Sequence, residues 1–191
     1  MSDGDEVLVT VVGDGQTVAV AESGSVSLWD IRNPAAPTRH PKPITIDTWA
    51  GSAQRGVAGL VAVGDSTLAV AGTDGWVAFY QVIEPGQPVL VGEIPGDDQI
   101  TSGVSVAVTT DRNTLALARG DLPVTLWDIT QPQQPHEIGT GIPGGGGLVA
   151  FAPDGNTLAT ADDSVLLWDV SIKDRPRRIG RPLTGGAPQA L

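Results

Sequence analysis

A motif that recurs four times along this 191-residue chain constrains its fold more than any other feature. Each copy ends in an aromatic residue followed by Asp or Gln, and successive copies lie 41 to 51 residues apart. The four pairs are Trp29-Asp30, Tyr80-Gln81, Trp127-Asp128 and Trp168-Asp169. A proline stands seven residues beyond every pair, and a second stands four residues beyond all but the last, which has Lys173 there. Self-similarity at a fixed interval is the signature of a repeat architecture.

A second set of aligned positions lies upstream of each motif. A threonine precedes the aromatic residue by 11 to 13 residues, and alanines follow that threonine at the second and fourth positions. The threonines are Thr17, Thr67, Thr114 and Thr157, and a turn-forming stretch rich in Gly, Asp or Asn stands just before each. Because successive side chains of a strand point to opposite faces, the alternate alanines predict a strand with one tightly packed face.

Each copy reads as four short strands separated by turns. In the last copy the expected strands are 148–151, 157–161 and 165–170, with a more polar fourth strand beginning at 177–179. No amphipathic helical stretch lies between the copies, which indicates an all-β chain. Four-stranded antiparallel sheets at this interval are typical of β-propeller blades. The sequence therefore predicts a single domain over 1–191, an all-β propeller with four blades at approximately 7–46, 57–94, 103–142 and 147–183.

The motif resembles that of a known family. The Leu-Trp-Asp triplets at 28–30, 126–128 and 167–169 resemble the closing motif of WD-repeat propellers, and the stretch 149–161 is similar to a segment common in bacterial members. The resemblance extends from about Val7 to Leu183. The chain departs from the family in lacking Gly-His before the first strands and in carrying Tyr80-Gln81 in its second copy. The resemblance implies the fold but little about function, because propellers host many functions.

The number of blades leaves the closure of the ring open. A WD propeller usually has about seven blades, whereas this sequence supplies four. Three arrangements are compatible with it: a piece of a longer propeller, a half-ring completed by a second copy, and a four-blade unit. Terminal repeats normally carry a polar cap, and neither end shows a capping helix or a charged terminal strand. We therefore expect apolar blade faces at both ends and self-association through them.

Composition excludes several classes of partner and site. The net charge of −11 disfavours a nucleic-acid partner, because binding to phosphates needs clustered Lys and Arg. No apolar run is long enough for a membrane-spanning helix, and the acidic N-terminus lacks the features of a secretion signal. We expect a cytoplasmic protein with no membrane contact. Abundant Ala, Gly, Val and Pro, with Arg in excess of Lys, indicate a GC-rich and therefore bacterial gene.

Residues that could carry chemistry are few. The chain has no cysteine and two histidines, and His40 and His136 are expected to be exposed on separate outer strands. Most aspartates, such as Asp14, Asp65, Asp111 and Asp154, lie in turns, where they cap their own backbone. The acidic pairs in the loops lack the ligand spacing of an EF-hand, and Gly144–Gly147 lacks the Lys and the helix of a phosphate-binding loop. We expect no catalytic residue, no metal and no cofactor. The alternative is a propeller-type hydrolase, similar to a lactonase or glycosidase, with an acidic metal-assisted site.

The family resemblance implies where a partner would bind. In WD propellers, partners commonly meet the face built from the second-to-third-strand loops and the connectors between blades. Trp49 and Trp76 are the two tryptophans outside the repeat position, and Trp and Arg are enriched at binding hot spots. The candidate partner-binding residues are Trp49, Arg55, Asp74, Trp76, Asp97, Asp98, Arg119 and Asp121. Their carboxylates predict an acidic face that favours a basic or neutral protein or peptide. The predicted function is a non-catalytic interaction or scaffold module within a larger bacterial signalling or regulatory protein.

Overall fold

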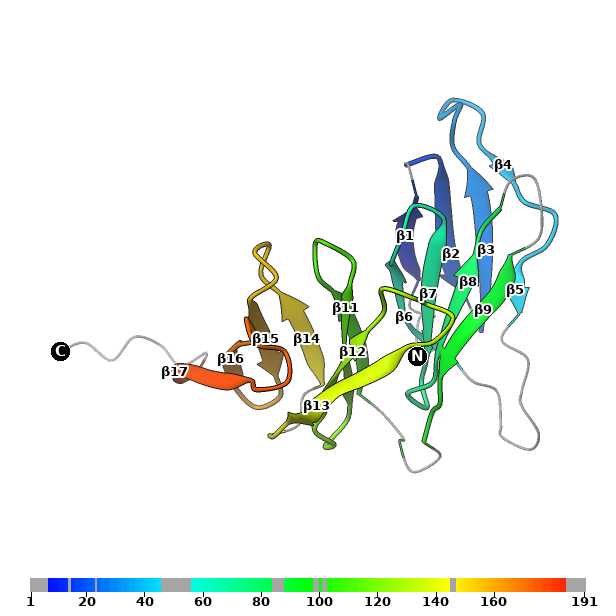
Figure 1. Cartoon of the computed structure of the whole chain (residues 1–191). Coiled ribbons are helices and arrows are strands. Elements are labelled where there is room, and N and C mark those ends of the chain that lie inside the picture. Colours follow the sequence, from blue (N-terminus) through cyan, green and yellow to red (C-terminus); the bar gives the residue numbers. More distant parts are fainter. Residues whose placement is uncertain are drawn as a thin grey trace, which may run out of the picture.

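Four antiparallel sheets, one for each sequence repeat, make up the computed structural model of the chain (Figure 1). The structure describes residues 7–13, 15–22, 24–45, 56–83, 88–97, 100, 103–144 and 147–184. In sheets 2, 3 and 4 the strands pair in sequence order, so that every connection within the sheet joins neighbouring antiparallel strands; sheet 1 follows the same order, except that its last two short strands both pair with the third. The prediction of an all-β propeller made of four-stranded antiparallel blades is confirmed.

The strand bounds follow the repeat. Sheet 1 holds β1 (Leu8–Val12), β2 (Thr17–Glu22), β3 (Ser25–Asp30) and a broken outer strand, β4 (Thr38–Arg39) and β5 (Ile44–Thr45), both paired with β3. Sheet 2 holds β6 (Val57–Ala62), β7 (Thr67–Gly72), β8 (Val77–Gln81) and β9 (Val89–Ile94). Sheet 3 holds β10 (Val104–Val108), β11 (Thr114–Arg119), β12 (Val124–Asp128) and β13 (His136–Ile142). Sheet 4 holds β14 (Leu148–Phe151), β15 (Thr157–Ala161), β16 (Val165–Asp169) and β17 (Arg177–Leu183).

The sheets stand side by side in chain order. The first strands contact one another in succession, β1 with β6, β6 with β10 and β10 with β14, so they form the inner side of the row. The fourth strands lie on the outer side. Sheets 1 and 4 lie at opposite ends of this open row (Figure 1). Within the described ranges no helix is long and apolar enough to cross a membrane.

Register gives each sheet two different faces. The face that carries the alanine columns is called the alanine face; it also bears the third-strand residues that pair with them, such as Leu28 opposite Ala19. The opposite face carries the repeated aromatic residue and is called the aromatic face; there Leu115 pairs with Trp127 and Leu158 with Trp168. The alternation of small and large residues noted in the sequence thus separates two surfaces of one sheet.

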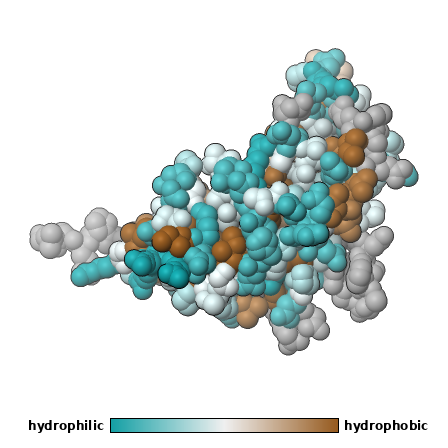
Figure 2. Space-filling view, viewed as in Figure 1, coloured by the Kyte–Doolittle hydropathy of each residue, from teal (hydrophilic) through white to brown (hydrophobic). Residues whose placement is uncertain are grey.

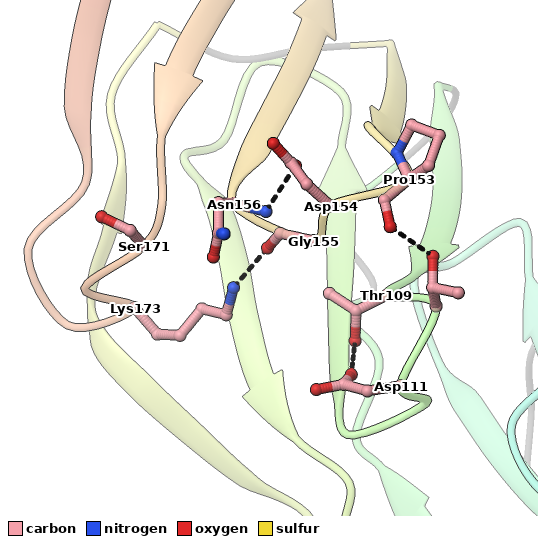
Figure 3. Close-up of a pocket in the computed structure, with 9 residues that line it drawn as sticks. Thr109, Asp111, Pro153, Asp154, Gly155, Asn156, Ser171 and Lys173 are labelled. Atoms are coloured by element: carbon pink, nitrogen blue, oxygen red, sulfur yellow. Dashed lines mark hydrogen bonds between the residues drawn. The ribbon is translucent and has the colours of Figure 1, made fainter.

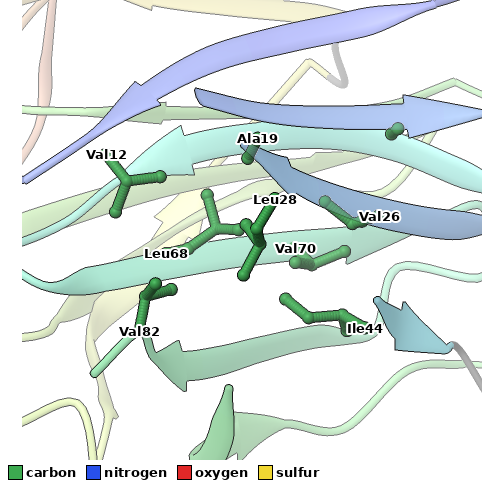
Figure 4. Packing of buried hydrophobic residues seen from close by; sticks show 9 residues of the cluster. Val12, Ala19, Val26, Leu28, Ile44, Leu68, Val70 and Val82 are labelled. Atoms are coloured by element: carbon green, nitrogen blue, oxygen red, sulfur yellow. The ribbon is translucent and has the colours of Figure 1, made fainter. Parts of the chain in front are cut away.

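The hydrophobic core lies between the sheets in three clusters. The cluster between sheets 1 and 2 joins the alanine face of sheet 1 to the aromatic face of sheet 2 (Figure 4), and it buries Leu28 and Val26 against Leu68 and Val70. The same pairing of faces recurs between sheets 2 and 3 and between sheets 3 and 4. Alanine leaves room for the larger side chains of the neighbouring sheet, so that the two faces interdigitate.

The repeated aspartates have a local structural role. Asp30, Asp128 and Asp169 each accept a hydrogen bond at Oδ1 from the backbone amide two residues later, at 2.9 Å in all three cases. Each closes the turn that follows the third strand of its sheet, as Asp side chains do in Asx turns. Hydrogen bonds from Arg32 lower the pKa of Asp30 from 3.8 to about 2. Hydrogen bonds from Thr130 and Ser171 lower the pKa of Asp128 and Asp169.

The packing of sheet 2 against sheet 3 predicts a large effect of truncating Phe79. This side chain is fully buried in the cluster between the two sheets. Phe79→Ala leaves a cavity and is expected to lower the free energy of unfolding by about 3–5 kcal/mol. Urea unfolding followed by circular dichroism measures the change. Val89→Ala, on the exposed outer strand β9, is the control and should change stability by about 0.5 kcal/mol or less. Equal losses for the two variants would contradict the packing described above.

The aspartate turns predict acid sensitivity. Because the folded-state pKa values of the three aspartates lie below their unfolded values, the unfolded state binds more protons than the folded state at acidic pH, and the folded state loses stability as the pH falls. The stabilisation is therefore present above the unfolded pKa of about 4 and is lost as the pH falls through the folded values, which for Asp30 means between 3.8 and about 2. The triple variant Asp30→Asn, Asp128→Asn, Asp169→Asn keeps an oxygen acceptor but does not titrate. Its urea midpoint is expected to fall less than that of the wild type over this pH range; parallel decreases would contradict the prediction.

Candidate interaction surface

A tight turn between β7 and β8 shapes the surface at the junction of sheets 2 and 3. The Gly72 amide donates to the Trp76 carbonyl at 2.8 Å, and the Gly75 amide donates to the Gly72 carbonyl at 3.0 Å. Gly75 has a φ of 75°, a left-handed conformation that glycine adopts without strain. A Cβ at Gly75 would also lie 2.8 Å from Cδ1 of Ile100. The turn therefore requires glycine, and it presents Asp74 and Trp76 together at one end of sheet 2.

The connector from sheet 2 to sheet 3 packs directly on this turn. The Asp97 amide donates to the Asp74 carbonyl at 2.9 Å. At Gly96, an added Cβ would lie 2.9 Å from the same carbonyl oxygen and 3.0 Å from Cβ of Trp76. No side chain larger than a hydrogen fits there without moving the backbone. The carboxylate-bearing residues 74 and 97 are thus held next to each other by backbone contacts.

Trp76 is half-buried against this connector. Its indole Nε1 donates to Oε2 of Glu93 at 3.3 Å. The other three sheets carry Ser25, Pro123 and Ser164 at the corresponding position, four residues before the repeated aromatic residue. Trp76 therefore adds a large, half-buried ring at a position where the repeat itself requires none.

Arg119, at the end of β11, links sheet 3 to the same cluster. Its Nη2 donates to the Pro95 carbonyl at 3.2 Å, and its Nε is buried without a hydrogen-bond partner. Its side chain also packs against Gly75, so that it extends from one sheet to the turn of the other. Burial lowers the pKa of the guanidinium from its ordinary value, and the carboxylates of Glu137, Asp97 and Asp74 oppose that shift. The guanidinium thus lies among carboxylates that favour its charged form.

The structure brings together four of the predicted partner-binding residues, Asp74, Trp76, Asp97 and Arg119. Asp121 is exposed two residues beyond Arg119, in a turn where the Leu122 amide donates to the Arg119 carbonyl at 3.1 Å. The predicted residues Trp49, Arg55 and Asp98 lie outside the described residues. The four clustered residues, together with Glu93, are called the junction cluster below.

Sequence reasoning missed Glu93 and Glu137. No motif marks Glu93; the antiparallel register places it opposite Ala78, and this brings its carboxylate to the indole of Trp76. Glu137 pairs with Trp127 on the outer strand of sheet 3, and its charge acts on Arg119. Both contributions arise within a single sheet, Glu93 with Trp76 in sheet 2 and Glu137 with Arg119 in sheet 3, and they depend on which strands pair and in which register.

A groove of about 480 Å³ lies at the opposite end of sheets 3 and 4, between their turns (Figure 3). Lys173, the exception in the proline column, lines it. Its ammonium donates to the Gly155 carbonyl at 2.6 Å and lies 5.8 Å from the ring centre of Phe151. Burial lowers the pKa of Lys173, and Asp111 and Asp154 oppose the shift. Lys173 thus fastens the loop after β16 to the turn before β15, a structural role.

The histidines do not approach each other or form part of the junction cluster. His136 is exposed, with Nε2 3.7 Å from Asp128. The expectation that His40 is exposed was wrong: it is half-buried and its Nε2 is fully buried without a partner, because its amide binds the Leu28 carbonyl and draws it onto sheet 1. Across the described part of the chain, no three His, Cys, Asp or Glu side chains lie close enough to hold a metal ion.

Solved structures share this fold. The chain is similar to a protein from Lactobacillus plantarum, with a TM-score of 0.70 and 16% identity over 88% of this chain and 54% of that one. It is similar to a protein from Bacteroides uniformis provisionally described as a 6-phosphogluconolactonase, with a TM-score of 0.75 and 12% identity over 94% and 55% of the two chains. A chain of the mitotic checkpoint complex has a TM-score of 0.64 and 20% identity over 93% and 53%.

No family model matches the sequence, and no curated protein matches it significantly. At these identities the structural similarity shows the fold alone. The chain spans a little over half the length of the solved structures it matches. The fold of this chain is therefore that of four successive β-propeller blades.

The close packing at Gly96 predicts the effect of a single added methyl group. Gly96→Ala forces the connector away from Asp74 and Trp76 and is expected to lower the free energy of unfolding by about 1–3 kcal/mol. Gly147→Ala is the matched control, because it also lies before the first strand of a sheet and its Cβ would make only an ordinary 3.8 Å contact. Urea unfolding of both variants gives the difference. If Gly96→Ala were as stable as Gly147→Ala, the connector would not be packed as described.

Proposed function

We propose that this chain is a non-catalytic WD-repeat module that binds a protein or peptide partner through the junction cluster. The observation that carries the proposal is the arrangement around the Asp74–Gly75 turn at the loop end of sheet 2, where Trp76 packs on Gly96 and Arg119 of sheet 3 packs on Gly75. Hydrogen bonds from Trp76 to Glu93 and from Arg119 to the Pro95 carbonyl fix both side chains in the absence of a partner. Side chains that are already ordered lose less conformational entropy on binding.

The chemistry of the cluster indicates the kind of partner. Trp and Arg are over-represented at binding hot spots because they offer large contact surfaces. The surrounding carboxylates of Asp74, Asp97 and Glu93 outnumber the single guanidinium, and the whole chain carries a net charge of −11. A basic or neutral segment of a protein would therefore associate faster and bind more tightly than an acidic one.

The WD-repeat assignment is supported by the repeat itself. Three of the four sheets carry Trp-Asp at the end of the third strand, and each of these aspartates closes the following turn in the same way. Propellers with such repeats commonly serve as scaffolds, and we propose this role in the cytoplasm, within a larger bacterial signalling or regulatory protein.

Panning a random peptide library against the immobilised full chain tests the proposal. The selected peptides should be enriched in Lys and Arg. Trp76→Ala should raise the dissociation constant of a selected synthetic peptide by about tenfold or more, the effect expected of a hot-spot residue. Isothermal titration calorimetry measures the affinity. Leu90→Ala, exposed on the outer strand β9, is the matched control and should leave the affinity unchanged. Enrichment of acidic peptides, or binding indifferent to Trp76, would refute the proposal.

A propeller-type hydrolase is the competing function, because one of the similar structures is described as a lactonase. It requires converging carboxylates and a metal ion. Thermal unfolding with and without added divalent cations, together with a lactone hydrolysis assay, separates the two functions. A metal-dependent rise in the unfolding temperature accompanied by lactone turnover would favour the hydrolase; unchanged unfolding and no turnover would favour the interaction module.

A further inference from the structure

Sheets 1 and 4 each leave one face uncovered, and these two faces are the two halves of a contact that occurs three times inside the molecule. Sheets 1, 2 and 3 direct their alanine face to the next sheet, while sheets 2, 3 and 4 direct their aromatic face to the preceding one. In the part of the chain that the structure describes, no sheet therefore covers the alanine face of sheet 4 or the aromatic face of sheet 1, and these two are called the free faces. Figure 2 shows hydrophobic residues exposed on the surface over sheet 4.

The free alanine face of sheet 4 carries a large hydrophobic residue at a position that is buried in the other three sheets. Val165 pairs with Leu183 across β16 and β17, as Val26, Val77 and Val124 pair with isoleucines in the other sheets. Those isoleucines, Ile44, Ile94 and Ile142, are 2%, 0% and 1% exposed. Leu183 is 55% exposed. The sequence thus keeps a large hydrophobic residue at a position that is covered in every other sheet.

The free aromatic face of sheet 1 shows the same mismatch. Val18 pairs with Trp29 and with Val11, and Val20 pairs with Val9. The residues equivalent to Val18 are Leu68, Leu115 and Leu158, and all three are fully buried by the preceding sheet. In sheet 1, Val18 is only half-buried, and its strand neighbours Val9 and Val11 are 61% and 51% exposed. A row of valines and a tryptophan therefore lies on a surface against which none of the described sheets packs.

We propose that the free aromatic face of sheet 1 binds the free alanine face of sheet 4 of a second copy of this chain. The argument for this occupant is that the chain packs these two kinds of face against each other three times already. Sheets 1 and 4 lie at opposite ends of the row (Figure 1), so they do not cover each other within one copy. A second copy presents both required faces without any further adaptation.

Two copies satisfy both faces at once. A two-fold axis places sheet 4 of each copy against sheet 1 of the other and closes an eight-sheet ring with two identical junctions and no free face. The chain spans 54–57% of the length of three propeller structures it matches, so two copies supply about the length of one such chain. A cation on the free face of sheet 1, Arg39, does not obstruct the junction, because its counterparts Leu90, Glu137 and Arg178 on the outer strands are exposed as well.

The oligomeric state of the full chain tests this proposal. Size exclusion with light scattering should give twice the mass of one chain at micromolar concentrations. Val9→Glu and Leu183→Glu each place a carboxylate in both junctions of the ring, so each variant should be a monomer with the circular dichroism spectrum of the wild type. Both residues are largely exposed in one copy, so neither change should prevent folding. Ile172→Glu, equally exposed in the loop after β16, is the matched control and should remain a dimer.

Mixing the two monomeric variants distinguishes this junction from a like-with-like contact. A mixture of Val9→Glu and Leu183→Glu retains one unaltered junction, between sheet 4 of the first variant and sheet 1 of the second. Dimers should therefore reappear in the mixture, with a higher dissociation constant than the wild type. A monomeric wild type would overturn the proposal and leave further blades as the occupant of these faces. A dimer broken by only one of the two substitutions, or no dimer in the mixture, would overturn it in favour of contacts between identical faces.

Discussion

The contact between the alanine face of one sheet and the aromatic face of the next is the interaction on which the other features of this structure depend. A single four-stranded sheet with two apolar faces buries too little surface to fold alone, and stacking the sheets is what removes those faces from water. Alanine at alternate positions of the second strand lets the neighbouring sheet approach, and leucine, valine and the repeated aromatic residue fill the space from the other side. Sheets 2 and 3 thus each contribute one face to each of two contacts, and sheets 1 and 4 each contribute a face to one.

The junction cluster depends on strand pairing within sheet 2 and on the stacking of sheet 3 against it. The turn at Asp74–Gly75 meets Gly96–Asp97 where the pairing of β8 with β9 continues past Val77 and Ile94, and the stacking brings Arg119 across from β11 to Gly75. The side chains are positioned by backbone hydrogen bonds and close packing. A loop surface supported in this way can present an aromatic ring and a guanidinium in defined positions, which is the usual relation between a rigid propeller and the variable loops at its ends.

The repeated stacking also leaves apolar surface at both ends of the row. Because every sheet directs its alanine face to the next sheet and its aromatic face to the preceding one, the two end faces differ from each other. Leu183 at one end and Val9 at the other are the residues that show it, since equivalent positions elsewhere in the row are partly or fully covered. Ring closure removes both ends with the same contact that builds the row, whereas a polar cap would need a different sequence at each end.

The sequence by itself determined the fold class, the repeat and the strands, because strand alternation and turn residues are local signals that act within about ten residues. It also indicated the turn role of Asp154, which accepts a hydrogen bond from the Asn156 amide at 2.8 Å. The tertiary structure alone decided which of the candidate side chains meet. Asp74 and Asp97 lie 23 positions apart in the sequence and become neighbours only when the connector folds back on the turn, and neither the contribution of Glu93 nor the burial of His40 has a local signal. Contacts between sheets depend on which face each sheet turns to its neighbour, and that is a property of the packed assembly of blades.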